Sequence, residues 1–253
     1  MIRYSYRCDK GGREQNQDSV LCVSKGDAYL FSVADGLGGY EDSALASFIV
    51  HETLNELFLE EFGEDKKVSI EDGFLESSVS ICQKMLTDIK KDKNVQGSYT
   101  TLVILLISGN KARWCHVGDS RLYYLKDGHI AEKTLDHSVP QMLFNAGMIK
   151  ENEIRGHPDR SKLLRAFGRD DKEVEADFSD IYEMDPGDAF LLCTDGFWEY
   201  VTENEIEDAF ETFEEPEDRM TAMETSVRDA GLRARTDNYT AVCVSVDREY
   251  DHS

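Results

Sequence analysis

The chain has 253 residues, of which 40% are hydrophobic and 31% are charged, and its 51 acidic against 28 basic residues give a formal net charge of −23. This excess of carboxylates repels a phosphate backbone and an anionic lipid surface, so neither nucleic acid nor a membrane is an expected partner. A solvated acidic surface is the simplest interpretation of the charge; cation binding and basic protein substrates are the alternatives.

Four prolines and scattered glycines form no linker-like tract, so we predict a single domain over residues 1–253. The N-terminus lacks the apolar stretch of a signal peptide, and the longest aliphatic run, 102–107, is too short to cross a bilayer. None of the six cysteines forms a CxxC pair. Four lie in apolar runs, which is typical of free thiols in a reducing compartment: Cys22, Cys115, Cys193 and Cys243. We therefore expect a cytoplasmic, monomeric protein.

Short apolar or alternating runs predict strands along most of the chain. In chain order they cover residues 19–24, 28–34, 100–107, 112–117, 121–126, 129–133, 189–194 and 239–246. Asp127-Gly128, between two alternating runs, predicts a two-residue hairpin. Most other connections are also short, which favours antiparallel pairing.

Apolar residues recur at helical spacing over 41–62 and 70–91, which predicts two amphipathic helices covering one sheet face. Residues 138–167 change to short helical pieces with polar breaks, and a last helix is expected at 216–231. Short strands with helices grouped between them predict an α+β architecture of two packed sheets flanked by helices.

Aspartates recur where the predicted strands begin or end. Asp18 opens a strand, Asp237 precedes the last strand, and three others close strands, namely Asp35, Asp119 and Asp195. A turn or cap role explains any one of them, because acidic residues are abundant, but it explains their recurrence less well. Strand ends meet at the rim of a two-sheet sandwich, so several of these carboxylates could share one cleft.

Two such carboxylates 4 Å apart repel each other by about 4 kcal/mol at an effective dielectric of 20. A hard divalent cation such as Mg²⁺ or Mn²⁺ removes that cost, because it prefers oxygen ligands. No Cys/His cluster with zinc spacing competes for this role. Arg13, in the polar loop before Asp18, could grip two oxygens of a phosphate, although a solvated charge is the commoner role for such an arginine.

The run VADGLGG at 33–39 places three glycines in the four positions after Asp35, more than one tight turn needs. Without a β-carbon, the backbone at Gly36 and at Gly196 can approach a metal or a phosphate closely, so the Gly36 carbonyl could itself be a ligand. The glycines at 38–39 would leave room for the chain to enter the next helix.

Eight motifs occur in a fixed order: R-x-x-N-Q-D-S, V-A-D-G-L-G-G, Y-T-T-L-V, H-V-G-D-S-R, D-H-S, L-L-R-A-F-G, L-L-C-T-D-G and T-D-N-Y-T. This set resembles the metal-dependent Ser/Thr protein phosphatases of the PPM, or type 2C, family, and most of all its small, single-domain bacterial members. The resemblance covers about residues 13–246. It implies a four-layer α-β-β-α sandwich of two antiparallel sheets flanked by helices, with a flap at about 138–165 that contributes to substrate choice.

The resemblance also implies a site with two Mg²⁺ or Mn²⁺ ions. Asp35 would bridge both ions, Asp195 and Asp237 would complete the shell of the first ion, and the Gly36 carbonyl would bind the second. A third ion, often seen in bacterial members, would lie between Asp119 and Asp195.

In the same comparison, Asp18 would hold metal-bound waters and Arg13 would bind the substrate phosphate. Arg13, Asp18 and Asp35 are therefore the expected catalytic residues. The implied reaction is in-line attack of a metal-bridging water on a phosphoserine or phosphothreonine of a protein, without a covalent enzyme intermediate. Phosphoproteins are the implied partners, together with a cognate Ser/Thr protein kinase whose action the enzyme reverses.

Two residues depart from the pattern of many eukaryotic relatives, which have a glutamate at position 17 and a histidine at position 37. Leu37 cannot protonate a leaving group, so a metal-bound water would have to do so, and Gln17 leaves the second ion with fewer charged contacts. His116, His137, Trp114 and Trp198 are expected to pack or support rather than to catalyse.

Two other functions stay open at this point. The first is a catalytically silent module of the same fold that holds a phosphopeptide or a cation, whose signature would be the loss of metal-binding aspartates. The second is a structural calcium-binding protein, although the chain lacks a D-x-[DN]-x-[DN]-G loop.

Overall fold

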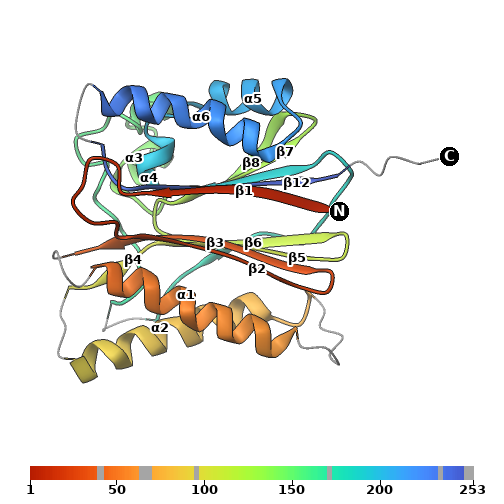
Figure 1. Cartoon of the computed structure of the whole chain (residues 1–253). Helices are drawn as coiled ribbons and strands as arrows, with labels where there is room; N and C mark the ends of the chain where they lie inside the picture. The colour runs from red at the N-terminus through yellow and green to blue at the C-terminus, as the bar shows by residue number, and fades with distance from the viewer. Residues whose placement is uncertain (39–42, 63–69, 94–96, 170–172, 233–235, 248–253) are drawn as a thin grey trace.

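Two antiparallel sheets stack face to face, and helices cover both outer faces, in the computed structural model of the chain (Figure 1). The structure describes residues 1–38, 43–62, 70–93, 97–169, 173–232 and 236–247. This arrangement confirms the predicted α+β sandwich of four layers.

The first sheet joins the two ends of the chain. Its strand order is β1 (Ile2–Asp9), β12 (Tyr239–Val246), β11 (Ala189–Cys193), β7 (Arg121–Lys126) and β8 (His129–Lys133). Strands β7 and β8 form the predicted hairpin, in which Asp127 and Gly128 both have positive φ, as a type I′ turn requires. Strand β12 pairs with β1 on one side and with β11 on the other. The end of β1, the start of β12 and the end of β11 therefore lie at the same end of this sheet.

The second sheet has the order β10 (Tyr182–Glu183), β6 (Lys111–Val117), β5 (Leu102–Ser108), β3 (Ala28–Leu37) and β2 (Asp18–Lys25). Two short strands extend it, since β4 (Tyr99–Thr100) pairs with β3 and β9 (Asp177–Phe178) pairs with β6.

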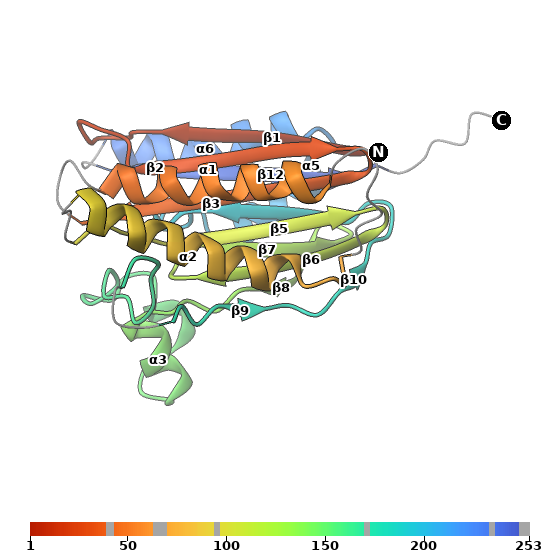
Figure 2. The same cartoon turned by 90° about the horizontal axis from the view of Figure 1, so that it is seen from below.

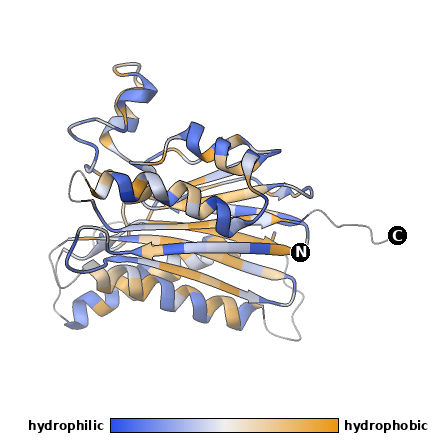
Figure 3. Ribbon diagram, turned by 45° about the horizontal axis from the view of Figure 1, so that its top comes forward, coloured by the Kyte–Doolittle hydropathy of each residue, from blue (hydrophilic) through white to orange (hydrophobic). Residues whose placement is uncertain are grey.

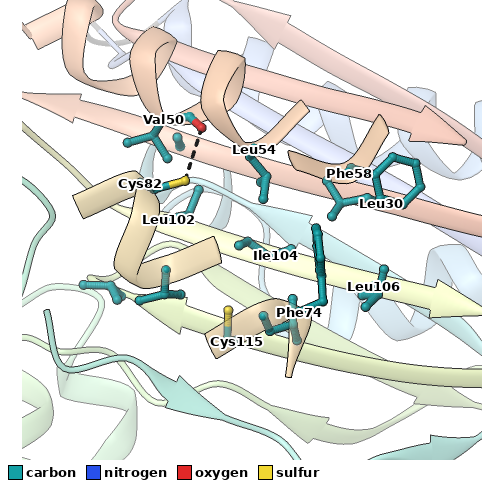
Figure 4. Packing of buried hydrophobic residues seen from close by; sticks show 14 of the residues in the cluster. Leu30, Val50, Leu54, Phe58, Phe74, Cys82, Leu102, Ile104, Leu106 and Cys115 are labelled. Carbon is teal, nitrogen blue, oxygen red and sulfur yellow. Dashed lines mark hydrogen bonds between the residues drawn. The ribbon is translucent and has the colours of Figure 1, made fainter. Parts of the chain in front are cut away.

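Strand β5 explains why the sequence at 102–107 is apolar at every position. Leu102, Ile104 and Leu106 face the helices outside the sheet (Figure 4). Val103, Leu105 and Ile107 lie in the core between the two sheets. A strand buried on both faces loses the alternation of apolar and polar residues that marks a half-buried strand.

Helices α1 (Ser43–Glu61) and α2 (Phe74–Lys93) cover the second sheet, as predicted. Helices α4 (Asp195–Trp198), α5 (Glu203–Thr212) and α6 (Pro216–Gly231) cover the first. Apolar segments gather on the strands while the helices carry mixed colouring, which fits helices with one face on a core (Figure 3). Within the ranges described above, no helix is both long and apolar enough to span a membrane.

The flap leaves the layered body between β8 and β9. It contains α3 (Val139–Asn145) and the 3₁₀ helix η1 (Glu151–Glu153), and Figure 2 shows α3 projecting beyond the sheets. Its two ends are tied together, because the amide of Leu164 donates to the carbonyl of His137 at 2.8 Å and Ser138 bridges to Leu163. The sequence prediction of an irregular segment with short helical pieces is correct here.

Several boundaries differ from the sequence prediction. Strand β1, in which charged and apolar residues mix and most positions are partly or fully exposed, was missed. Helix α5, in which half of the residues are acidic, was missed as well. Asp35 lies inside β3 rather than at its end, and Asp195 begins α4 instead of closing a strand.

Candidate metal centre

The pairing of β2 with β3 brings the first two aspartates together. Asp18 and Asp35 are direct partners in this antiparallel register. The backbone of Asp35 is held on its other side by Thr101, whose hydroxyl accepts from the Asp35 amide at 3.0 Å and whose amide donates to the Asp35 carbonyl at 2.9 Å. Two neighbouring strands and one threonine therefore fix the place of Asp35.

The first sheet supplies Asp195 and Asp237 from neighbouring strand ends. Thr194, just before Asp195, donates its hydroxyl proton to the Asp18 carboxylate at 2.8 Å, which links the two sheets. A β-carbon at Gly196 would lie 1.9 Å from the Asn238 carbonyl oxygen. Gly196 is thus needed for the close packing of α4 on residues 237–238. The expectation that this glycine also lets the backbone approach a metal or a phosphate stays a prediction.

Asp119 follows β6 and is also buried, with 3% of its surface exposed. Its carbonyl accepts a hydrogen bond from the indole of Trp198 at 2.8 Å. Trp198 is therefore more than a packing residue, because it connects α4 to the backbone of Asp119. Trp114, in contrast, packs between the sheets against Tyr182, as expected.

Arg13 and Gly36 both lie at this cluster. The Arg13 guanidinium donates to the Asp237 carboxylate at 2.7 Å, so it is at the acidic rim, about half exposed. Gly36 is buried in β3, directly after Asp35, and its amide donates to the Gln17 carbonyl at 3.1 Å. Gly38 has a φ of 137° and approaches the Gly97 carbonyl so closely that a β-carbon would lie 2.0 Å from it. Gly39 lies outside the described residues.

The carboxylates strongly disfavour one another's ionised forms. Burial raises the pKa of Asp18 to about 7, with the charge of Asp195 adding to the effect. Burial, followed by the charges of Asp18 and Asp195, raises the pKa of Asp35 well above its ordinary value. Burial and the Asp195 charge do the same to the pKa of Asp119. The physical cause is loss of hydration among like charges.

These residues fit a hard divalent cation. The Oδ1 atom of Asp18 is buried without a hydrogen-bond partner, so a donor or a cation is needed there. Asp35, Asp195 and Asp237 are partly exposed, which leaves the cluster open to solvent on one side. The donors are carboxylate and carbonyl oxygens, the ligands that Mg²⁺ and Mn²⁺ prefer.

The thermal stability of the protein should depend on the protonation of Asp18 and on the binding of a divalent cation. Between the ordinary aspartate pKa of 3.8 and the value of about 7 for Asp18, the folded state keeps a proton that the unfolded chain has lost. Without a divalent cation we therefore expect Tm to fall as the pH rises from about 4 to 7. Added Mn²⁺ should raise Tm by about 5–10 °C at 100 times its Kd. At one fixed Mn²⁺ concentration the rise should be larger at pH 7.5 than at pH 5.5, because protons compete with the cation and raise its Kd at the lower pH.

Differential scanning calorimetry with and without Mn²⁺ at the two pH values measures this effect. An equal shift of Tm at both pH values, or none at either, would contradict the acidic site described above.

Arg160, which is absent from the residues predicted from sequence, reaches the cluster from the flap. Its guanidinium donates to the Asp195 carboxylate at 2.8 Å and forms an ion pair with Glu199 at 2.9 Å. No local pattern marks this residue, since it lies in a polar, irregular stretch like many solvated arginines. Only the path of the flap over α4 reveals it.

A second group of possible ligands, His116, His137 and Asp177, lies at the base of the flap. The two imidazole rings stack within 16° of parallel, so their in-plane lone pairs cannot point at one ion. The Gly118 amide donates to Nδ1 of His137, which leaves the proton on Nε2, 3.1 Å from the Asp177 carboxylate. This group is thus a hydrogen-bonded support for the flap, in agreement with the supporting role expected for both histidines.

An α-β-β-α sandwich with an acidic cluster suited to divalent cations at the rim between its sheets matches the architecture expected for the metal-dependent (PPM) protein phosphatases. Comparison with known proteins leads to the same class. The family described as Protein phosphatase 2C matches residues 11–234, and the chain belongs to this family.

The chain is similar along its whole length to serine/threonine protein phosphatase PstP of Mycobacterium tuberculosis, with 32% identity over 253 residues, which are 100% of this chain and 46% of PstP. Protein phosphatase PhpP of Streptococcus pneumoniae is 28% identical over 238 residues, 94% of each chain. The chain therefore spans about half the length of PstP but nearly all of PhpP.

Solved structures show the same likeness. The crystal structure of M. tuberculosis PstP/Ppp has a TM-score of 0.83 at 30% identity and covers 98% of this chain and 99% of its own. The catalytic domain of PstP in complex with 2 manganese ions has a TM-score of 0.79 at 28% identity, with the same coverage.

Proposed function

We propose that this protein is a Mg²⁺/Mn²⁺-dependent phosphatase that removes phosphate from phosphoserine and phosphothreonine in proteins. The observation that carries the proposal is the meeting of five aspartates from both sheets beside Arg13 in a member of the Protein phosphatase 2C family. The names of PstP and PhpP, and the manganese ions in a PstP structure, support it.

Each residue has a task that follows from its position. Asp35, Asp195 and Asp237 would hold two cations, with the Gly36 carbonyl as a further ligand. The cations, when bound, supply a water that is acidic near neutral pH and offset phosphate charge. Thr194 orients the Asp18 carboxylate so that its unpaired oxygen can accept a proton from water.

At the open side, the half-exposed Arg13 can turn from Asp237 to a phosphate and grip two of its oxygens. Leu37 is partly exposed next to the cluster and has no proton to give. We therefore assign protonation of the leaving serine or threonine to water.

Finer features belong to the same proposal. A third cation would lie between Asp119 and Asp195, whose charges act on each other. A bacterial Ser/Thr protein kinase would supply the phosphoproteins. We further propose that the chain works as a monomer and as one domain. We also propose a reducing cytoplasm, because all six cysteines are free.

A silent phosphopeptide- or cation-binding module is the weaker proposal. Its expected signature, loss of metal-binding aspartates, does not occur at the five positions described. The relatives named above are called phosphatases as well.

Activity on a phosphothreonine peptide and on p-nitrophenyl phosphate, measured with Mn²⁺ and after chelation, tests the proposal. We expect phosphate release from both with Mn²⁺ and a loss of at least about 10²-fold with EDTA, because the carboxylates alone repel the phosphate. Recovery on adding back Mn²⁺ is the control for denaturation. Full activity in EDTA would exclude a metal-dependent reaction, and tight peptide binding without turnover would favour the silent module.

A further inference from the structure

The flap touches the body of the protein through a group of alternating charges. Two of these residues belong to the flap, Glu151 and Arg155, and two to the body, Lys133 at the end of β8 and Glu203 at the start of α5. Lys133 lies 2.6 Å from Glu151 and 3.7 Å from Glu203, and Arg155 lies 2.8 Å from Glu203. We call these four residues the flap clasp.

Arg155 reaches two groups of the body with one side chain. One guanidinium nitrogen donates to the Glu203 carboxylate and the other donates to the Val201 carbonyl at 3.2 Å. Its side chain is only 24% exposed. A planar guanidinium bound to two acceptors restricts the orientation of the flap segment that carries it. A lysine ammonium on its flexible side chain would restrict that segment less.

The clasp is adjacent to the acidic site. The Arg155 guanidinium lies 5.5 Å from the centre of the Trp198 ring, and the Trp198 indole donates to the Asp119 carbonyl. Glu203 also lies 3.6 Å from the buried Arg121, which stacks on the same ring at 3.5 Å. Through Trp198, the clasp thus contacts the residue that is hydrogen-bonded to the backbone of Asp119 in the acidic cluster.

None of the four clasp residues belongs to the acidic cluster. Arg160 of the same flap reaches Asp195, so the flap borders the acidic cluster, and a protein chain, being larger than a small phosphate ester, would extend from the cluster toward it. We propose that Arg155 is a positioning residue that holds the flap in place through Glu203 and thereby sets the binding of phosphoprotein substrates, without a part in the chemistry. This inference rests on the proposed function.

The test compares Arg155→Met, which removes the charge and both donors, with Arg155→Lys, which keeps the charge. Lys162→Met is the matched control, because Lys162 is a flap cation whose exposed partner, Asp159, lies in the flap itself. For Arg155→Met we expect KM for a phosphothreonine protein to rise about tenfold, with kcat/KM on p-nitrophenyl phosphate within about twofold of the wild type. Arg155→Lys should recover part of this loss, and Lys162→Met should leave the kinetic constants for both substrates unchanged.

Glu203→Gln should also raise KM for the phosphothreonine protein, and the double variant should lose less than the sum of the two single losses, because the Arg155–Glu203 contact is common to both. Each single variant also removes contacts of its own, from Glu203 to Lys133 and Arg121 and from Arg155 to Val201. Equal loss on both substrates, additive losses in the double variant, or no change in Arg155→Met would each overturn the proposal.

Hydrogen–deuterium exchange of the flap amides gives a readout that needs no activity. We expect faster exchange over 141–160 in Arg155→Met, and not in Lys162→Met, at an unchanged global Tm. If the wild type hydrolyses neither substrate, the proposed function fails, while faster exchange would still support the clasp. Unchanged exchange would refute the clasp, whatever the activity.

Discussion

Asp35→Asn is expected to lower metal-dependent phosphate release by at least about 10²-fold. Removing residues that merely orient a metal ligand costs about 10–100-fold in affinity or activity, so loss of the carboxylate at the centre of the cluster should cost no less. Asp35 is the group on which the charges of Asp18, Asp195, Asp119 and Asp237 all act. The measurements are kcat/KM on a phosphothreonine peptide and Mn²⁺ affinity by calorimetry.

Asp229→Asn is the matched control, because it removes the same charge from an exposed site on α6. It should leave both quantities unchanged. The Asp35 variant should also be at least as stable as the wild type without metal, since one repelling carboxylate is gone. Wild-type activity in Asp35→Asn would exclude this aspartate from the reaction.

The largest effect on stability is expected from Asp136→Ala. Asp136 forms a two-pronged ion pair with Arg121, at 2.7 and 2.8 Å, and their side chains are 2% and 6% exposed. Removing Asp136 leaves the buried Arg121 charge without its two close acceptors, with Glu203 at 3.6 Å as the nearest remaining carboxylate among the described residues. Breaking a buried pair in this way costs about 3–5 kcal/mol of the free energy of unfolding. Urea denaturation followed by circular dichroism measures this loss.

Asp185→Ala provides the comparison, because it breaks the Lys126–Asp185 pair, whose side chains are 44% and 76% exposed. An exposed pair contributes about 0–1 kcal/mol, so this variant should unfold close to the wild-type urea midpoint. Similar losses in the two variants would show that burial of the Arg121–Asp136 pair carries no extra energy.

Local sequence patterns were sufficient for most of the fold. Strands β7, β8 and β12 and helix α6 have the predicted limits, because alternation and helical periodicity are properties of neighbouring residues. Strand β1 was missed because its pairing with β12, at the far end of the chain, stabilises it more than its own composition does. Helix α5 was missed because only Ile206, Ala209 and Phe210 are buried in an otherwise acidic segment.

The residue types of the candidate site were also apparent in the sequence. Asp18, Asp35, Asp119, Asp195 and Asp237, with Arg13, belong to short motifs whose order identifies the family. A motif is continuous in the chain, so it can be read without knowing what it touches.

The contacts among these residues depend on the tertiary structure alone. The hydrogen bond from Thr194 to Asp18 joins residues 176 positions apart, and nothing near either residue predicts it. The same holds for Arg160 on Asp195 and for Arg155 on Glu203, since the part of the flap after η1 is irregular and gives no period from which to place a side chain. By itself the sequence determined the layers, the family and the acidic residues. Folding decided which oxygens meet and which partners the flap arginines contact, because those distances are set by strand register and by packing between remote segments.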